Sequence, residues 1–170
     1  MLPYDTWIVE QRVRYLAEGE RYADALAVAK ACGAGGWRCD ALVGFANHLL
    51  EDYVAAERAF DAALTHMDSK ASCAWTDISP LLDNVAIAQF RLLKCDDPER
   101  AAWTARTMAL ARPLYSMHGN DARTEWFARQ TMVLMLSDAV TPYQFGFDAD
   151  ERELLLRFGW PRGWGGSMMS

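Results

Sequence analysis

The sequence predicts an all-α protein of about seven or eight helices, stacked as antiparallel hairpins. Apolar residues recur at helical spacing along most of the chain. Strand signals are few, because there is no long alternation of apolar and polar residues and no Asn-Gly or Asp-Gly hairpin turn. Residues 21–26 and 52–64 share a phrase in which Tyr precedes small residues, a pattern typical of a short helix packed closely against its partner.

Capping residues, glycine and proline predict where the helices begin and end. We expect helices at about residues 6–17, 21–32, 37–50, 53–67, 80–93, 98–111, 121–136 and 148–158.

In the N-terminal half, turn residues separate two pairs of helices. Asp5 or Thr6 can cap the first helix, and residues 18–20 form the turn to the second. The second helix ends at the glycine-rich run 33–36, since glycine readily takes the left-handed conformation that closes a helix. Only residues 51–52 separate the third helix from the fourth, so these two must fold back as a hairpin.

In the C-terminal half, proline and aspartate set the boundaries. Pro80 predicts a break within the long segment 68–93, because proline removes a backbone donor and disfavours helix in the residue before it. Asp97 is expected to cap the next helix, with a proline in its first turn. Asp148 and Glu151 can form the capping box of a last short helix.

Composition and charge limit the function classes. With 170 residues, 52% of them hydrophobic, the chain can bury one core, and we expect a helical domain at 1–158 and a Gly- and Trp-rich tail at 159–170. The formal net charge of −6 lacks the basic excess that a phosphate backbone demands, so no nucleic acid partner is expected. No apolar stretch reaches the roughly 18 residues that span a bilayer, and the N-terminus has acidic residues where a signal peptide is basic and then apolar. We therefore expect a cytoplasmic protein without membrane contact.

The cysteines at positions 32, 39, 73 and 95 are even in number and would permit two disulfides. None is spaced as CxxC, and the chain is large enough not to need covalent staples. Free, largely buried thiols are the expectation.

The segment 37–69 resembles a unit of the tetratricopeptide repeat (TPR) family, whose helix-turn-helix units stack into arrays. Gly44 stands at the close contact of two helices, Tyr53 opens the second helix, and Ala56 and Phe60 form the A-x3-F element. The departures are Asn47, Asp40 and Asp68, where the family usually has Tyr, often has Trp and commonly has Pro. Weaker units precede and follow, so that the resemblance covers about residues 6–112, with an insertion at about 69–80. It implies a short right-handed superhelix.

The resemblance also implies a concave groove, lined by the first helix of each hairpin, that binds a peptide or protein partner. The expected partner-binding residues on these inner faces are Glu10, Arg14, Arg38, Phe45, His48, Leu49, Phe90 and Lys94. The alternative is that Phe45, Leu49 and Phe90 simply pack the core. A clamp for a peptide's terminal carboxylate is not expected, because Phe45 and Phe90 stand where it would need asparagines.

No constellation in the sequence points to catalysis, a metal or a cofactor. The histidines at 48, 66 and 118 lie far apart and lack metal-ligand spacing. The favoured function is therefore a non-catalytic interaction module of the TPR type. The alternative is a regulatory or sensory domain that binds a small ligand in a helical pocket lined by Trp75, Trp103 and Trp126.

The tail carries Trp160 and Trp164 in a glycine-rich stretch that cannot form a helix. Three interpretations are open. The tryptophans dock on the chain's own helices as a cap, they dock on a partner or a second copy of the chain, or the chain is a piece of a larger protein.

Overall fold

The fold is all helical, as the sequence predicts, throughout the part of the chain that the structure describes. The structure is a computed structural model that describes residues 5–112, 118–137, 139 and 147–160. Its elements are α1 (Thr6–Glu18), α2 (Tyr22–Lys30), α3 (Trp37–Leu49), α4 (Tyr53–His66), α5 (Ser69–Trp75), the 3-10 turn η1 (Ser79–Leu81), α6 (Asn84–Phe90), α7 (Pro98–Leu110), α8 (Asp121–Ser137) and α9 (Ala149–Phe158). None of the described helices is both long and apolar enough to cross a membrane.

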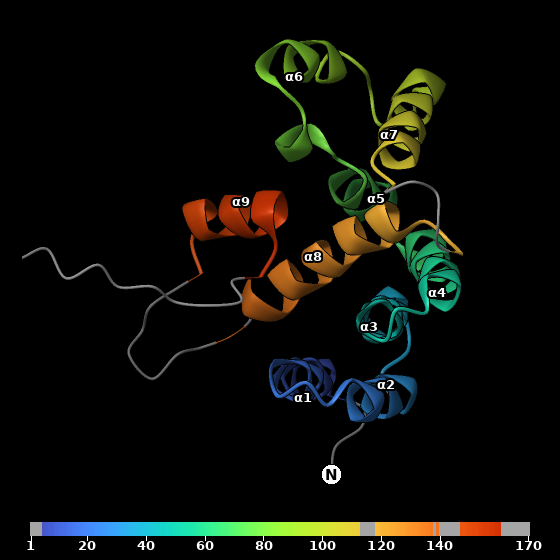
Figure 1. The fold of residues 1–170 in the computed structure, drawn as a ribbon, viewed down its shortest axis with the longest axis vertical. Helices are drawn as coiled ribbons and strands as arrows, with labels where there is room; N and C mark the ends of the chain where they lie inside the picture. Colours follow the sequence, from blue (N-terminus) through green and yellow to red (C-terminus); the bar gives the residue numbers. More distant parts are fainter. Residues whose placement is uncertain (1–4, 113–117, 138, 140–146, 161–170) are drawn as a thin grey trace, which may run out of the picture.

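The first four helices form two antiparallel hairpins with the same turn (Figure 1). Glu20 in the first turn has a φ of 57°, and Glu51 in the second turn has a φ of 61°, so both residues adopt a left-handed conformation. In the first turn the amide of Arg21 donates to the carbonyl of Leu16 at 2.8 Å, and in the second the amide of Asp52 donates to a carbonyl five residues earlier at 3.0 Å. The sequence motif that residues 21–26 and 52–64 share is thus preceded in both hairpins by a turn with the same backbone conformation.

The second hairpin closes on a contact that only glycine permits. A Cβ atom added at Gly44 of α3 would lie 2.7 Å from the ring of Phe60 in α4. That ring is fully buried, as are Ala56 and Ala63 on the same face of α4. The predicted close approach of the two helices at Gly44 is confirmed.

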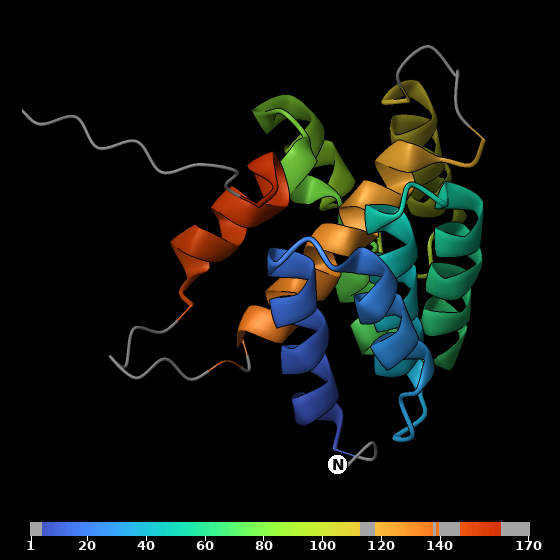
Figure 2. The same cartoon turned by 60° about the horizontal axis from the view of Figure 1, so that its bottom comes forward.

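Helix α8 crosses the hairpins and joins them to the rest of the molecule (Figures 1 and 2). The amide side chain of Gln11 in α1 donates to the carbonyl of Met135 at 2.9 Å. The rings of Phe60 and Phe127 have centroids 5.4 Å apart, and the indole of Trp126 donates to the backbone carbonyl of Trp75 at 2.9 Å. Because α8 contacts α1, α4 and α5, its buried face is the centre of the core.

The segment after the second hairpin differs from the expected single principal helix at 80–93. It contains the short helix α5, the turn η1 and the short helix α6. Asp68 caps α5 by accepting from the amide of Ala71, and Asp83 caps α6 by accepting from the amides of Val85 and Ala86. Each Asp caps the helix that follows it and so sets a helix boundary, which helical periodicity alone does not reveal.

The expectation of free thiols is wrong, because all four cysteines are paired. Cys32 and Cys39 join the end of α2 to α3 with their Cα atoms 5.8 Å apart, and Cys73 in α5 joins Cys95 before α7 at 5.5 Å. Sequence spacing gave no sign of either pairing. The first depends on the fold-back of the glycine-rich run, and the second on the inserted helix α5.

The predicted division at 158/159 stays a prediction, since Gly159 and Trp160 are the tail residues that the structure describes. Trp160 is 41% exposed. The remainder of the tail, Trp164 included, lies outside the described residues, as does the predicted irregular segment 141–146.

We predict that Gly44→Ala lowers the free energy of unfolding by about 1–3 kcal/mol, because the new methyl group overlaps the buried ring of Phe60. Urea denaturation measures the change. Gly19→Ala is the matched control, since a Cβ atom there would meet its nearest neighbour at an ordinary 3.4 Å, and it should change stability by less than about 0.5 kcal/mol. Equal effects of the two substitutions would contradict the close-contact account.

Candidate functional site

Six of the eight predicted groove residues lie on α1 and α3 of the hairpins, and most of the eight are covered. Phe45 and Phe90 belong to the hydrophobic core and are 1% and 0% exposed, while Leu49 is half-buried against the core. Glu10 is fully buried, and its carboxylate accepts from Arg38 at 3.0 Å across the α1–α3 contact.

The other three predicted residues are dispersed. Arg14 pairs with Glu18 within α1 at 3.4 Å. Lys94 is exposed in the turn between α6 and α7. His48 faces α8. The eight residues therefore do not line one open groove, and their role in binding a partner stays a prediction.

His48 and Glu125 form the main polar link between α3 and α8. Nε2 of His48 donates to the Glu125 carboxylate at 2.7 Å, and Nδ1 shares a hydrogen bond with the Thr124 hydroxyl at 3.0 Å. Arg129 donates to the other carboxylate oxygen of Glu125 at 2.7 Å. The hydrogen bond from His48, followed by those from Arg129, lowers the pKa of Glu125 to about 2 against the opposing effect of burial. The carboxylate is thus held ionised as a structural contact.

The histidines do not gather into a reactive centre. His48 contacts Glu125 at the C-terminal end of α3, whereas His66 contacts Asp40 at 2.7 Å near its N-terminal end, and His118 is exposed. Within the described ranges, no three His, Cys, Asp or Glu residues are placed to hold a metal ion.

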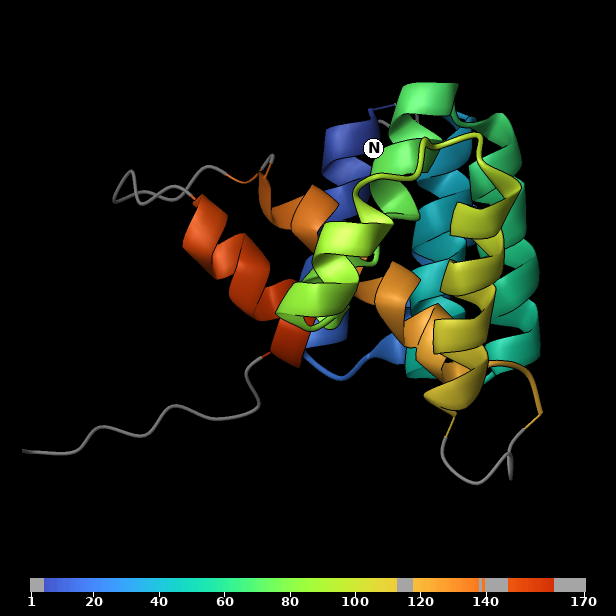
Figure 3. The same ribbon diagram turned by 90° about the horizontal axis from the view of Figure 1, so that it is seen from above.

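An open cleft of about 630 Å³ lies between α9 and the segment that carries η1 and α6. Figures 1 and 3 show α9 beside the segment that carries these elements. We call it the α6–α9 cleft. Its lining residues are Ala74, Asp77, Ser79, Pro80, Ile87, Arg91, Gln130, Ser137, Phe147, Asp148, Ala149, Arg152, Glu153, Leu156 and Arg157.

The acidic groups of the α6–α9 cleft already have contacts. Asp77 lies 3.5 Å from the guanidinium of Arg100 and also accepts from the amide of Ser79. Asp148 caps α9, where it accepts from two backbone amides. Glu153 pairs with Arg157 at 2.8 Å.

Two basic groups of the cleft differ from these acids. Arg91, at the end of α6, and Arg152, on α9, are exposed, and their side chains have no ion-pair or hydrogen-bond partner among the described residues. They come from opposite walls. The cleft therefore combines apolar lining with two guanidinium groups that have no partner in the part of the chain that the structure describes.

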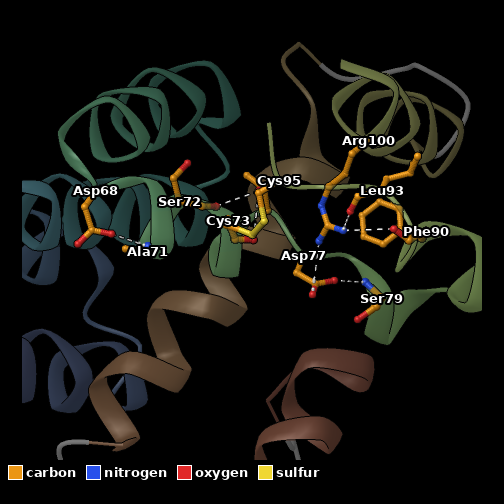
Figure 4. The surroundings of a disulfide bond; sticks show 11 residues. Asp68, Ala71, Ser72, Cys73, Asp77, Ser79, Phe90, Leu93, Cys95 and Arg100 are labelled. Carbon is orange, nitrogen blue, oxygen red and sulfur yellow. Dashed lines mark hydrogen bonds and ion pairs between the residues drawn. A yellow bond between two sulfur atoms is a disulfide. The ribbon is translucent and has the colours of Figure 1, made fainter. Parts of the chain in front are cut away.

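One wall of the cleft is fixed by a disulfide and a buried arginine (Figure 4). Cys73 and Cys95 close a loop with a sequence separation of 22, which contains η1 and α6. Arg100 lies 4.1 Å above the ring of Phe90 and donates to the carbonyls of Phe90 and Leu93, each at 3.3 Å. Because Arg100 also approaches Asp77, it joins both ends of this loop.

A second cavity, of about 410 Å³, lies among α4, α5, α7 and α8. Trp126 lines it, but Trp75 and Trp103 do not. Trp75 is buried beside Phe127, and Trp103 packs edge-on against Phe90 with ring centroids 5.9 Å apart. The three tryptophans of the predicted small-ligand pocket therefore do not line one cavity.

Comparison of the chain with protein-family models, with curated proteins and with solved structures finds no match.

The residues of the α6–α9 cleft are absent from the set predicted from sequence. Pro80 and the inserted segment around it were the available signal, since they interrupt the repeat pattern. The sequence could not show that Arg91 and Arg152 line the same cleft, because only the structure shows that α9 lies opposite α6.

We predict that Glu125→Gln lowers the free energy of unfolding by about 1 kcal/mol at neutral pH, a value reduced for the 41% exposure of the side chain. The pKa of Glu125 is lower in the folded chain than its usual 4.5, so the stabilisation is present above about pH 4.5 and is lost as the pH falls towards about 2. Urea denaturation between pH 7 and pH 3 should show the two stabilities converging with falling pH.

Glu153→Gln is the control for this series, because its exposed pair within α9 should contribute less than about 0.5 kcal/mol. A constant difference between the wild-type chain and Glu125→Gln across the pH range would contradict the assignment.

We predict that the double substitution Cys73→Ser and Cys95→Ser lowers the free energy of unfolding by about 3 kcal/mol, since it frees a loop of this length in the unfolded chain. Urea denaturation under oxidising conditions measures the loss. Cys32→Ser with Cys39→Ser, which opens a loop with a separation of only 7, should cost about 2 kcal/mol. Wild-type stability in the Cys73/Cys95 variant would mean that the bond does not hold the wall.

Proposed function

We propose that the chain is a non-catalytic, TPR-like interaction module that binds a peptide or protein partner in the α6–α9 cleft. The observation that carries this proposal is the contrast between two surfaces. The inner side of the hairpins packs against α8, whereas the cleft at the interrupted end of the array is open and has apolar and charged lining. Clefts of this size with a few convergent polar groups are the usual places where ligands bind.

Two features support the TPR-like part of the proposal. The hairpin turns at Glu20 and Glu51 repeat the same backbone, and Gly44 packs against Phe60 of the A-x3-F element. Both are expected where helical hairpins stack closely in an array. A right-handed superhelix belongs to the same proposal.

The partner is proposed to be protein, with neither nucleic acid nor a membrane involved. The net charge of −6 is unfavourable for a phosphate backbone. A second copy of the chain, bound through the tail at Trp160, is an alternative partner. The cytoplasmic location stays a prediction, and the two disulfides argue against it, because the cytosol keeps most thiols reduced.

The second candidate function, binding of a small ligand, is favoured by the cavity beside Trp126. A ligand there would contact the indole directly. Titration with a panel of metabolites, followed by tryptophan fluorescence in the wild-type chain and in Trp126→Phe, separates this function from peptide binding.

Selection from a random peptide display library on the whole chain tests the proposed function. We predict that selected peptides bind Ile87→Gln roughly tenfold more weakly than the wild-type chain, because the substitution removes apolar lining from the cleft. Val85→Gln is the matched control, since it lies on the same helix, is 72% exposed and does not line the cleft. Circular dichroism checks that both variants fold.

Failure to enrich any peptide would contradict the proposal, and so would equal binding to the two variants. If Ile87→Gln unfolds, Ala149→Trp on the opposite wall replaces it, since this exposed position can obstruct the cleft without disturbing the core.

A further inference from the structure

We propose that the occupant of the α6–α9 cleft is an acidic segment of the partner, whose carboxylates bind Arg91 and Arg152. This inference rests on the proposed function of the cleft and specifies the chemistry of its ligand.

The charge balance of the cleft carries the inference. Three acids and three arginines line it, so the cleft has no excess charge by count. The acids, however, are occupied by Arg100, by backbone amides and by Arg157, whereas Arg91 and Arg152 have no partner among the described residues. The charged groups that remain available to a ligand are therefore the guanidinium groups of Arg91 and Arg152.

Arginine suits the recognition of carboxylates. The planar guanidinium donates two parallel hydrogen bonds to a carboxylate, and such charge-assisted bonds are stronger than neutral ones. Arg91 and Arg152 lie on opposite walls, so a single ligand that reaches both must cross the cleft. A ligand with two spaced carboxylates meets this requirement.

The rest of the lining favours a peptide over a polyphosphate. Pro80, Ile87 and Leu156 provide apolar surface that a phosphate chain cannot use. A peptide with acidic and apolar side chains can place carboxylates at the two arginines and apolar groups between the walls.

The net charge of −6 does not prevent this binding at ordinary salt concentration. The Debye length is about 8 Å at physiological ionic strength, so exposed acids farther from the cleft are largely screened. A ligand in the cleft then interacts mainly with the charged groups that line it.

The test compares two double variants that carry the same net charge. Arg91→Gln with Arg152→Gln removes both cations of the cleft. Arg58→Gln with Arg106→Gln removes two exposed arginines of α4 and α7 that do not line it and likewise have no partner among the described residues. Peptides selected from the random display library on the whole chain are the probe.

We expect the selected peptides to be rich in Asp and Glu around apolar residues. Their affinity should fall at least about tenfold for the Arg91/Arg152 variant and change less than about twofold for the Arg58/Arg106 variant. Circular dichroism and urea denaturation establish that both variants fold as the wild-type chain does.

Several outcomes would overturn the inference. Peptides without acidic excess, or equal losses in the two variants, contradict recognition by Arg91 and Arg152, while weaker binding to Ile87→Gln would still uphold the cleft as a peptide site. No enriched peptide at all contradicts the proposed function as well. A wild-type dimer in sedimentation that dissociates in the Arg91/Arg152 variant assigns the cleft to a second copy of the chain and rejects an acidic peptide.

Discussion

The packing of α8 against the inner side of the helical hairpins is the interaction on which the rest of the structure depends. It contacts α1 through Gln11, α3 through His48, and α5 through the indole of Trp126. At its N-terminal end, the amide of Asn120 donates to Glu57 of α4 at 3.1 Å. Two hairpins alone would leave their inner apolar face in water, so α8 completes the core and also provides the surface on which α9 rests.

This arrangement leaves the α6–α9 cleft, at the place where the expected repeat pattern is interrupted, as the proposed binding surface. In a regular array the inner helix faces stay free for a ligand, but in this chain α8 lies against them. The inserted segment, with α5 and η1, forms a wall that the Cys73–Cys95 bond closes and Arg100 holds. The cleft therefore depends on two departures from the expected repeat pattern, which are the inserted segment that forms this wall and the helix α9 that faces it.

The local features of the fold were predictable from sequence, whereas its long-range features were not. Gly44 and Phe60 identified a close contact between two helices, and Asp97 and Asp148 were correctly predicted as caps, because each of these signals depends on residues close together in the chain or within one hairpin. The helix α5, the disulfides and the cover that α8 places over the inner faces depend on contacts between distant segments. The predicted site residue His48 shows the limit. Its place on the inner face of α3 could be predicted, but not its partner Glu125, 77 residues away.

Native-state hydrogen exchange at low urea concentration tests most directly the claim that α8 completes the core. The account predicts that amides in the buried part of α8, from Thr124 to Met135, exchange only through global unfolding, with the same free energy as the slowest amides of α3 and α4. Exchange of α8 through a separate opening of much lower free energy, while α3 and α4 remain protected, would contradict it. The inner faces of the hairpins would then be accessible to a partner.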